Sequence, residues 1–204
     1  MEISRGSILI VIDVQKGWDK SVWGKRNNPD AEEKISKILD FWRKNGLRVA
    51  YCKHDSLNPK SPLYPGQDGN EIKESVKPRS DEKVFIKHVN SCFIGTDLEK
   101  WIRDIGGDEL YFCGITTQHC VSTTARMAGN LGFKNYVIED ATVSFDITDS
   151  HGNHYDADEV HKINLASIEG EFSAIVSTRD ILNAHISRFP VARKLHPSGW
   201  RGIA

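Results

Sequence analysis

Short apolar runs that alternate with helical patterns are the feature of this sequence that most restricts its fold. Ser7 to Asp13 reads SILIVID, a continuous apolar run closed by an acid, and Leu47 to Cys52 is a second run of strand type. A strand that is apolar throughout is buried on both faces of its sheet. Strands of this kind that alternate with helices predict a parallel sheet with helices on both sides.

We therefore predict an α/β fold, a three-layer α/β/α sandwich around a mostly parallel, doubly wound sheet of the Rossmann-like type. The helix expected from Asp30 to Gly46 fits this pattern, with a stripe of apolar residues at Ile35, Ile38, Leu39 and Trp42. Asp30 and Glu33 have the spacing of a capping box at its start. We assign residues 1–188 to one domain and residues 189–204 to a basic tail that could dock on a partner subunit.

The composition argues against several classes of partner. The 204 residues include 27 basic and 28 acidic side chains, a net charge of −1, so we expect neither nucleic acid nor an anionic membrane as a partner. The early apolar run Ile8 to Ile12 is too short for a membrane span or a signal sequence. The 4 cysteines include no CxxC pair, which argues against a disulfide framework or a zinc ribbon. We expect a cytoplasmic protein with reduced thiols.

The stretch from Glu109 to Leu131 combines a strand, a tight turn and a helix. Its apolar run ends at Gly114, and small polar residues then lead to Cys120 at the start of a helical pattern. Ligands of open parallel sheets collect at such strand-to-helix turns. Unpaired backbone N–H groups and the helix dipole would favour a thiolate there, so Cys120 is the candidate nucleophile. The alternative is that Cys120 simply fills a position in the core.

Asp13, Lys87 and Cys120 share one property: each ends or follows a predicted buried strand at its carboxyl side. In a doubly wound sheet the three residues then lie on one rim, near the point where the winding direction reverses. A carboxylate can accept the thiol proton, a lysine can stabilise both anions, and a thiolate can attack an electrophilic carbon. Taken singly, the aspartate could be a turn residue and the lysine a solvated one.

Four motifs then occur in order along nearly the whole chain: VIDVQKGW with Asp13, KHVNSCF with Lys87, GITTQHCVSTTARMAGNLGF with Cys120, and DATVSFD from Asp140. In these motifs the chain resembles the isochorismatase-like cysteine hydrolase superfamily. The resemblance implies a catalytic triad in which Asp13 is the general acid and base, Lys87 the electrostatic partner and Cys120 the nucleophile.

The resemblance also implies a non-proline cis peptide bond between Ile115 and Thr116. This bond would turn the Thr116 N–H group, together with that of Cys120, toward a developing oxyanion. Members of the family commonly form oligomers, so we expect a homo-oligomer.

Cys120 bears on the type of reaction. Family members that cleave isochorismate lack the nucleophilic cysteine, so its presence favours the amide and ureido hydrolases. We predict hydrolysis of an amide, ureido or N-carbamoyl C–N bond of a small molecule through a thioester on Cys120. The alternatives are isochorismatase-type or ester hydrolysis, and a non-catalytic sensor or binding protein whose Cys120 is oxidised.

We expect no cofactor and no metal. Nicotinamidases of the family carry an Asp-x-His motif and further histidines after the second strand, where this chain offers only His54 and Asp55. A second group of possible ligands follows later in the chain. Because it lacks helical i, i+4 pairing, a solvated loop that leads into a helix is the better interpretation of His151, His154, Asp156, Asp158 and His161.

Four further residues are assigned to substrate binding. Trp18 and Trp23 lie in the polar loop from Val14 to Pro29 and are either packing anchors or an apolar wall over a site. Phe93 is expected to face the substrate, whereas His119 either contacts it or lies on a helix face. The irregular segment of residues 56–81 is long enough to suggest an excursion over the active site.

Overall fold

The computed structural model describes residues 1–187, which form a central six-stranded sheet whose neighbouring strands are all parallel. The spatial order is β4-β3-β2-β5-β6-β9. The strands are β2 (Ile8–Ile12), β3 (Arg48–His54), β4 (Lys83–Lys87), β5 (Glu109–Ile115), β6 (Lys134–Val143) and β9 (Ala174–Val176). The chain thus winds outward from β2 in one direction and from β5 in the other, which confirms the predicted doubly wound fold. The tail predicted at residues 189–204 lies outside the described residues.

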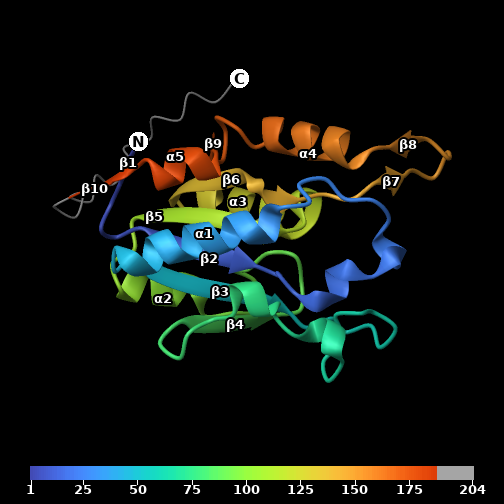
Figure 1. The fold of residues 1–204 in the computed structure, drawn as a ribbon, viewed down its shortest axis with the longest axis horizontal. Helices are drawn as coiled ribbons and strands as arrows, with labels where there is room; N and C mark the ends of the chain where they lie inside the picture. Colours follow the sequence, from blue (N-terminus) through green and yellow to red (C-terminus); the bar gives the residue numbers. More distant parts are fainter. Residues whose placement is uncertain (188–204) are drawn as a thin grey trace.

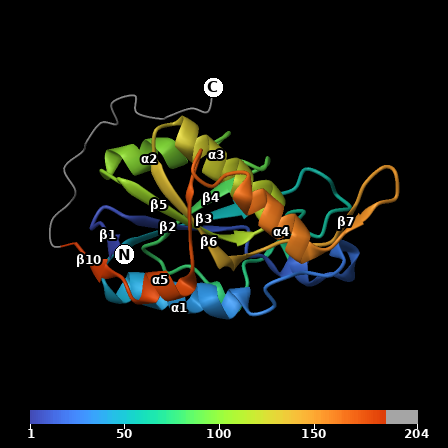
Figure 2. The ribbon, with the colours of Figure 1, turned by 90° about the horizontal axis from the view of Figure 1, so that it is seen from above.

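Helices cover both faces of the sheet (Figures 1 and 2). One face carries α1 (Ala31–Lys44) and α5 (Thr178–Leu182), and the other carries α2 (Leu98–Asp104), α3 (Ser122–Asn130) and α4 (Ala157–Ala166). The side chains of β2 alternate between these layers: Ile8, Ile10 and Ile12 pack with the second group of helices, whereas Leu9 and Val11 pack with the first. The run is apolar at every position because both of its faces are buried.

The remaining elements are short. Strand β1 (Glu2–Ile3) pairs with β10 (His185–Ile186), and β7 (Ile147–Thr148) with β8 (His154–Tyr155) forms a hairpin that extends from the body (Figure 1). Residues 14–29 contain the helical turns η1 (Lys16–Asp19) and η2 (Ser21–Trp23), and residues 56–81 contain η3 (Asp68–Asn70) and η4 (Glu74–Val76). None of the helices within residues 1–187 combines the length and the apolar character needed to cross a bilayer.

The capping box predicted at the start of α1 is wrong. Asp30 occupies the N-cap position, but its side chain makes no capping bond and instead accepts a hydrogen bond of 3.2 Å from Lys34 Nζ. Its backbone is not extended (ψ 12°), whereas capping requires the extended conformation that Asp156 (ψ 158°) and Ser177 (ψ 163°) adopt. These two residues do cap α4 and α5.

Strand β5 continues through Gly114, where the sequence analysis ended the apolar run, and includes Ile115. Gly114 has a φ of +127°, and a Cβ atom there would lie 2.0 Å from the carbonyl oxygen of Ile12. Only glycine permits this approach of β5 to β2. The approach places the turn after β5 next to the end of β2.

Candidate active site

Asp13 follows the last residue of β2 and is buried, with 1% of its surface exposed. Its φ of +51° is unusual for a residue other than glycine. Three hydrogen bonds hold this backbone: Asp13 N donates to Cys52 O (2.8 Å), while Asp13 O accepts from Gln15 N (2.8 Å) and from Trp18 Nε1 (2.7 Å). The position of the carboxylate is therefore set by β3 and η1 together.

Lys87 ends β4 and is fully buried. Because β3 lies between β4 and β2, the Lys87 side chain reaches across the end of β3 to Asp13, where Nζ lies 2.6 Å from Oδ2. Nζ also lies 3.2 Å from the Val89 carbonyl oxygen, 3.2 Å from His54 Nδ1 and 3.4 Å from Cys120 Sγ. A buried ammonium is tolerated only when it is paired and hydrogen-bonded, and these contacts provide both.

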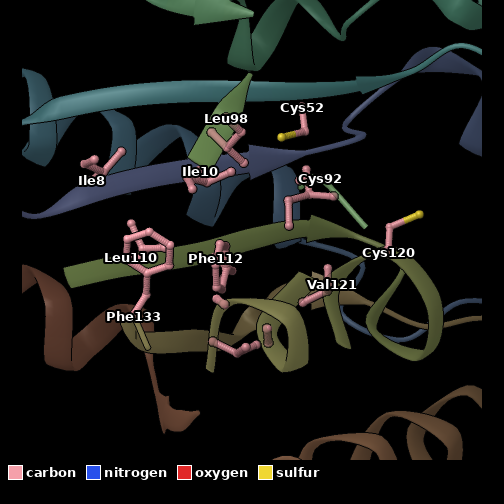
Figure 3. Close-up of a cluster of buried hydrophobic side chains, with 14 of the residues drawn as sticks. Ile8, Ile10, Cys52, Cys92, Leu98, Leu110, Phe112, Cys120, Val121 and Phe133 are labelled. Carbon is pink, nitrogen blue, oxygen red and sulfur yellow. The ribbon is translucent and has the colours of Figure 1, made fainter. Parts of the chain in front are cut away.

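Cys120 lies in η5 (Thr117–Val121), a π-helical turn that leads into α3. The peptide bond between Ile115 and Thr116 is cis, and the Thr116 carbonyl accepts from the N–H of Val121, five residues on (3.1 Å). Cys120 is 5% exposed and lies at the edge of the core cluster drawn in Figure 3, with its sulfur directed away from Phe112 and Val121. The thiol therefore faces the rim where Asp13 and Lys87 meet.

Burial sets the protonation of this centre. It raises the pKa of the Asp13 carboxyl, against the opposing effect of the Lys87 ammonium. Burial and the neighbouring Asp13 also raise the pKa of the Cys120 thiol well above its ordinary value. The prediction that the helix terminus favours a thiolate is therefore wrong for the free protein, because loss of solvent and a nearby carboxylate outweigh the local dipole. Burial and the nearby carboxyl thus both favour the neutral form of the Cys120 thiol.

The carboxylate has an oxygen that is available for a proton. Asp13 Oδ2 bonds to Lys87, whereas Oδ1 is buried and has no hydrogen-bond partner among residues 1–187. A buried acceptor without a partner is uncommon and has a functional explanation when a reacting group can fill it. The side chains of Asp13 and Cys120 shift each other's pKa: the Cys120 thiol lowers the pKa of Asp13, and the Asp13 carboxylate raises the pKa of Cys120.

His54 belongs to this centre, although the sequence interpretation considered it only as a metal ligand. Asp13, His54 and Cys120 each place a donor atom within 4.8 Å of the others, and no other group of His, Cys, Asp and Glu in the described part of the chain does so. The Lys87 ammonium contacts all three, so this position already holds a cation. The sequence held one signal for this placement, because His54 follows the second apolar run, and the carboxyl ends of parallel strands meet at one edge.

The residues assigned to substrate binding are dispersed. Trp18 and Trp23 pack against each other (ring centroids 4.6 Å apart) and with Phe145, which favours their interpretation as packing anchors. Phe93 stacks on the core residue Phe133, with centroids 6.0 Å apart. His119 is exposed, although loss of solvent around its ring lowers its pKa. Of these four, Trp18 has a hydrogen bond to the triad, through the Asp13 carbonyl.

The later histidines do not converge on one point. His151 is exposed on the hairpin, His154 lies 3.6 Å from Asp146, and His161 is buried, where its Nδ1 lies 2.9 Å from Thr117 Oγ1 at the start of η5. His161 also lines one of two cavities, of about 580 and 530 Å³, that lie along β6 and β9. The lining of neither cavity includes a residue of the triad.

Comparison with known proteins identifies the family of this chain. The isochorismatase domain model matches residues 7–180. The isochorismatase family protein YrdC of Bacillus subtilis (strain 168) is 47% identical over 178 residues, which span 87% of this chain and 95% of YrdC. A crystal structure of an isochorismatase-family protein from Chromobacterium violaceum ATCC 12472 is 43% identical with a TM-score of 0.86 and covers 89% of this chain and 95% of its own.

A more distant relative carries an activity in its name. The ureidoacrylate amidohydrolase RutB of Caulobacter segnis is 29% identical over 181 residues, which span 88% of this chain and 67% of RutB. The domain match covers most of the chain, and both the sequence and the structure of the nearer relatives agree with it. The chain therefore belongs to the isochorismatase family of hydrolases.

Proposed function

We propose that this hydrolase cleaves a C–N bond in a small amide, ureido or N-carbamoyl compound through a thioester on Cys120. The observation that carries the proposal is the buried contact of three groups: Lys87 Nζ lies 2.6 Å from Asp13 Oδ2 and 3.4 Å from Cys120 Sγ. A nucleophile, a proton acceptor and a fixed cation are the components of covalent acyl transfer. The amidohydrolase activity named for RutB supports the C–N bond as the target.

In the first half of the reaction, Asp13 accepts the thiol proton as Cys120 Sγ bonds to the substrate carbonyl carbon. The carbonyl electrons move to its oxygen, which the N–H groups of Thr116 and Cys120 stabilise. The C–N bond then breaks, and Asp13 returns the proton to the departing amine. Because burial raises the pKa of Asp13, the carboxyl holds a proton more readily than an exposed carboxyl and is suited to both transfers.

In the second half, water attacks the thioester. Asp13 accepts a proton from the water, the C–S bond breaks, and the proton returns to the Cys120 sulfur. The thiol and the carboxylate are then restored. Lys87 remains charged throughout, since the Asp13 carboxylate and the neighbouring thiol raise its pKa against the effect of burial. Its role is electrostatic, and it holds Asp13 in place through a bond of 2.6 Å.

The raised pKa of Cys120 fits this scheme. A thiol that ionises only when a substrate is present is protected from oxidation while the site is empty. The loss of the proton is coupled to the attack, because the acceptor Asp13 lies beside the thiol. Assignment of Trp18, Trp23, Phe93 and His119 to substrate binding stays a prediction, as do the homo-oligomer and the cytoplasmic location.

The test is ammonia release from a panel of small amides, ureides and N-carbamoyl compounds. Wild type, Cys120→Ser and Cys120→Ala are compared, each with and without a chelator. We expect ammonia from wild type alone, insensitive to the chelator, and a covalent acyl group on Cys120 in acid-quenched samples. Full turnover by Cys120→Ala would refute the nucleophile. If esters are hydrolysed and no compound with a C–N bond is, the protein is an ester hydrolase. If Cys120 is oxidised and no substrate is turned over, the protein is better explained as a thiol-based sensor.

A further inference from the structure

The Lys87 ammonium has more hydrogen-bond acceptors around it than hydrogens to donate. It carries three N–H groups. The acceptors are Asp13 Oδ2 (2.6 Å), Val89 O (3.2 Å), His54 Nδ1 (3.2 Å) and Cys120 Sγ (3.4 Å). The two oxygens take one hydrogen each, so the third is shared between a nitrogen and a sulfur. At any moment, either His54 Nδ1 or Cys120 Sγ is therefore without a full hydrogen bond from Lys87.

His54 is uncharged at neutral pH. Burial and the neighbouring Lys87 ammonium lower its pKa to about 4; His88 adds to this effect and Asp55 opposes it. A neutral imidazole has one acceptor nitrogen and one N–H group. Because Nδ1 faces the ammonium, it is the acceptor and the hydrogen resides on Nε2.

The position of His54 is set by the strand framework. In the sheet, His54 of β3 is paired with Lys87 of β4. The buried Gln15 binds the backbone of His54 twice: its Oε1 accepts from His54 N (3.0 Å) and its Nε2 donates to His54 O (2.9 Å). Gln15 N in turn donates to Asp13 O at 2.8 Å. His54 is thus tied to both residues of the buried ion pair.

We propose that His54 is a positioning residue that accepts the third Lys87 hydrogen while Cys120 is acylated. This inference rests on the proposed thioester chemistry. A thiolate accepts a hydrogen bond from an ammonium readily, whereas the uncharged sulfur of a thioester is a weak acceptor. With the sulfur acylated, the buried ammonium would have an unsatisfied N–H group, which is unfavourable. His54 Nδ1 removes this cost and keeps Lys87 on Asp13, which must then accept a proton from water.

This role makes the two halves of the reaction respond differently to substitution. During acylation the sulfur gains negative charge as the thiol loses its proton and is then itself a strong acceptor for Lys87, so loss of the imidazole has little effect. During deacylation His54 is the remaining acceptor for that hydrogen. We expect His54→Leu to slow deacylation by about tenfold to hundredfold, as for loss of a hydrogen bond to a charged group. His54→Asn retains an acceptor close to the place of Nδ1 and should recover most of the wild-type rate.

The experiment uses p-nitrophenyl acetate as an acylating probe. The initial burst of p-nitrophenolate reports acylation, the steady rate reports deacylation, and mass spectrometry measures acetyl-Cys120. We expect a burst rate within a few-fold of wild type for His54→Leu, a slow steady rate and an accumulated acetyl-enzyme. His88→Asn is the matched control, because His88 is exposed and its ring contacts the Asp55 carbonyl, and it should behave as wild type.

The outcomes separate this inference from the proposed function. If wild type forms no acetyl-Cys120, the thioester mechanism fails and this inference fails with it. If wild type forms it and His54→Leu deacylates at the wild-type rate, His54 has no such role and the mechanism stands. Equal slowing of both steps would identify a structural effect and also overturn the inference. Should His54→Leu not fold, His54→Ala is assayed with added imidazole, and failure of imidazole to restore deacylation counts against it.

Discussion

The buried Asp13 and the partly buried Glu32 are both paired with cations, yet their pKa values are shifted in opposite directions. Asp13 contacts one cation, Lys87, through one oxygen, and its pKa is raised. Glu32 in α1 accepts two bonds of 2.8 Å from Arg26 and one of 2.7 Å from Lys73. Burial opposes ionisation of Glu32 as well, but these bonds outweigh it and lower its pKa to about 2.

The difference lies in how completely each carboxylate is bonded. Both oxygens of Glu32 accept hydrogen bonds, and the positive charges of Arg26 and Lys73 lie beside them. The ionised form of Glu32 is therefore strongly favoured. Asp13 has one oxygen without a partner among the described residues. Glu32 fixes structure: it joins α1 to the loop of Arg26 and to the segment of Lys73. A carboxylate that exchanges protons during a reaction needs an oxygen that is free of other hydrogen-bond donors.

The largest expected effect comes from Asp13→Asn, which removes the proton acceptor and keeps the shape. Turnover should fall by about 100-fold to 10,000-fold, the usual contribution of general acid–base catalysis. The Cys120 thiol should respond in the opposite direction. Asp13 raises its pKa, so the variant should form thiolate at lower pH and react faster with iodoacetamide at pH 7. Steady-state rates and alkylation rates measure the two effects.

The control for the alkylation is the double variant Asp13→Asn/Cys120→Ala. It should lose the fast-reacting thiol, because Cys113 is fully buried and burial raises its pKa. Turnover within tenfold of wild type would show that another group serves as the base. Slower alkylation in Asp13→Asn would show that the carboxylate helps to form the thiolate in the free protein.

Lys87→Met should have the next largest effect, on stability as well as on activity. It leaves the Asp13 carboxylate buried without its cation, which costs about 3–5 kcal/mol of unfolding free energy. Urea unfolding measures this loss. The double variant Asp13→Asn/Lys87→Met removes both charges and should be more stable than Lys87→Met alone. If the double variant is no more stable, the loss arises from packing of the lysine stem.

Glu32→Gln should cost on the order of 3 kcal/mol of unfolding free energy at neutral pH, with activity largely retained. The folded pKa of Glu32 is about 2, below the ordinary value of 4.5. Its contribution is therefore present above pH 4.5 and is lost as the pH falls through 2. Unfolding measured from pH 7 to pH 2 should show wild type and variant converging in acid. A constant difference across this range would contradict the ionic origin of the stabilisation.

The rim that holds the triad could be predicted from the sequence because it follows from strand ends. Asp13, Lys87 and Cys120 each come after an apolar run, and the carboxyl ends of parallel strands meet on one edge. The same rule also applies to His54, which ends β3, although it was not used for that residue. It did not show that His54 faces Lys87, because the order β4-β3-β2 of the strands is a property of the assembled sheet.

What the sequence could not supply depends on burial and on backbone angles. The thiolate expected at Cys120 ignored the loss of solvent around the sulfur, which dominates its pKa. The capping box at Asp30 had the right residue types but the wrong backbone angle. Trp18 and Trp23 were equally compatible with packing and with binding until their contact with Phe145 was known.

The smallest expected effect comes from an ion pair that lacks burial. Asp30 lies 3.1 Å from Lys34 in α1 and is half-exposed, and Lys34 also lies 3.5 Å from Asp140. A double-mutant cycle with Asp30→Asn and Lys34→Met isolates the first pair, and we expect a coupling of about 0.3–0.5 kcal/mol in urea unfolding. Added salt should reduce it, since the pair is screened. A coupling as large as the stabilisation expected for Glu32 would mean that neither burial nor the number of bonds separates strong from weak carboxylate pairs in this protein.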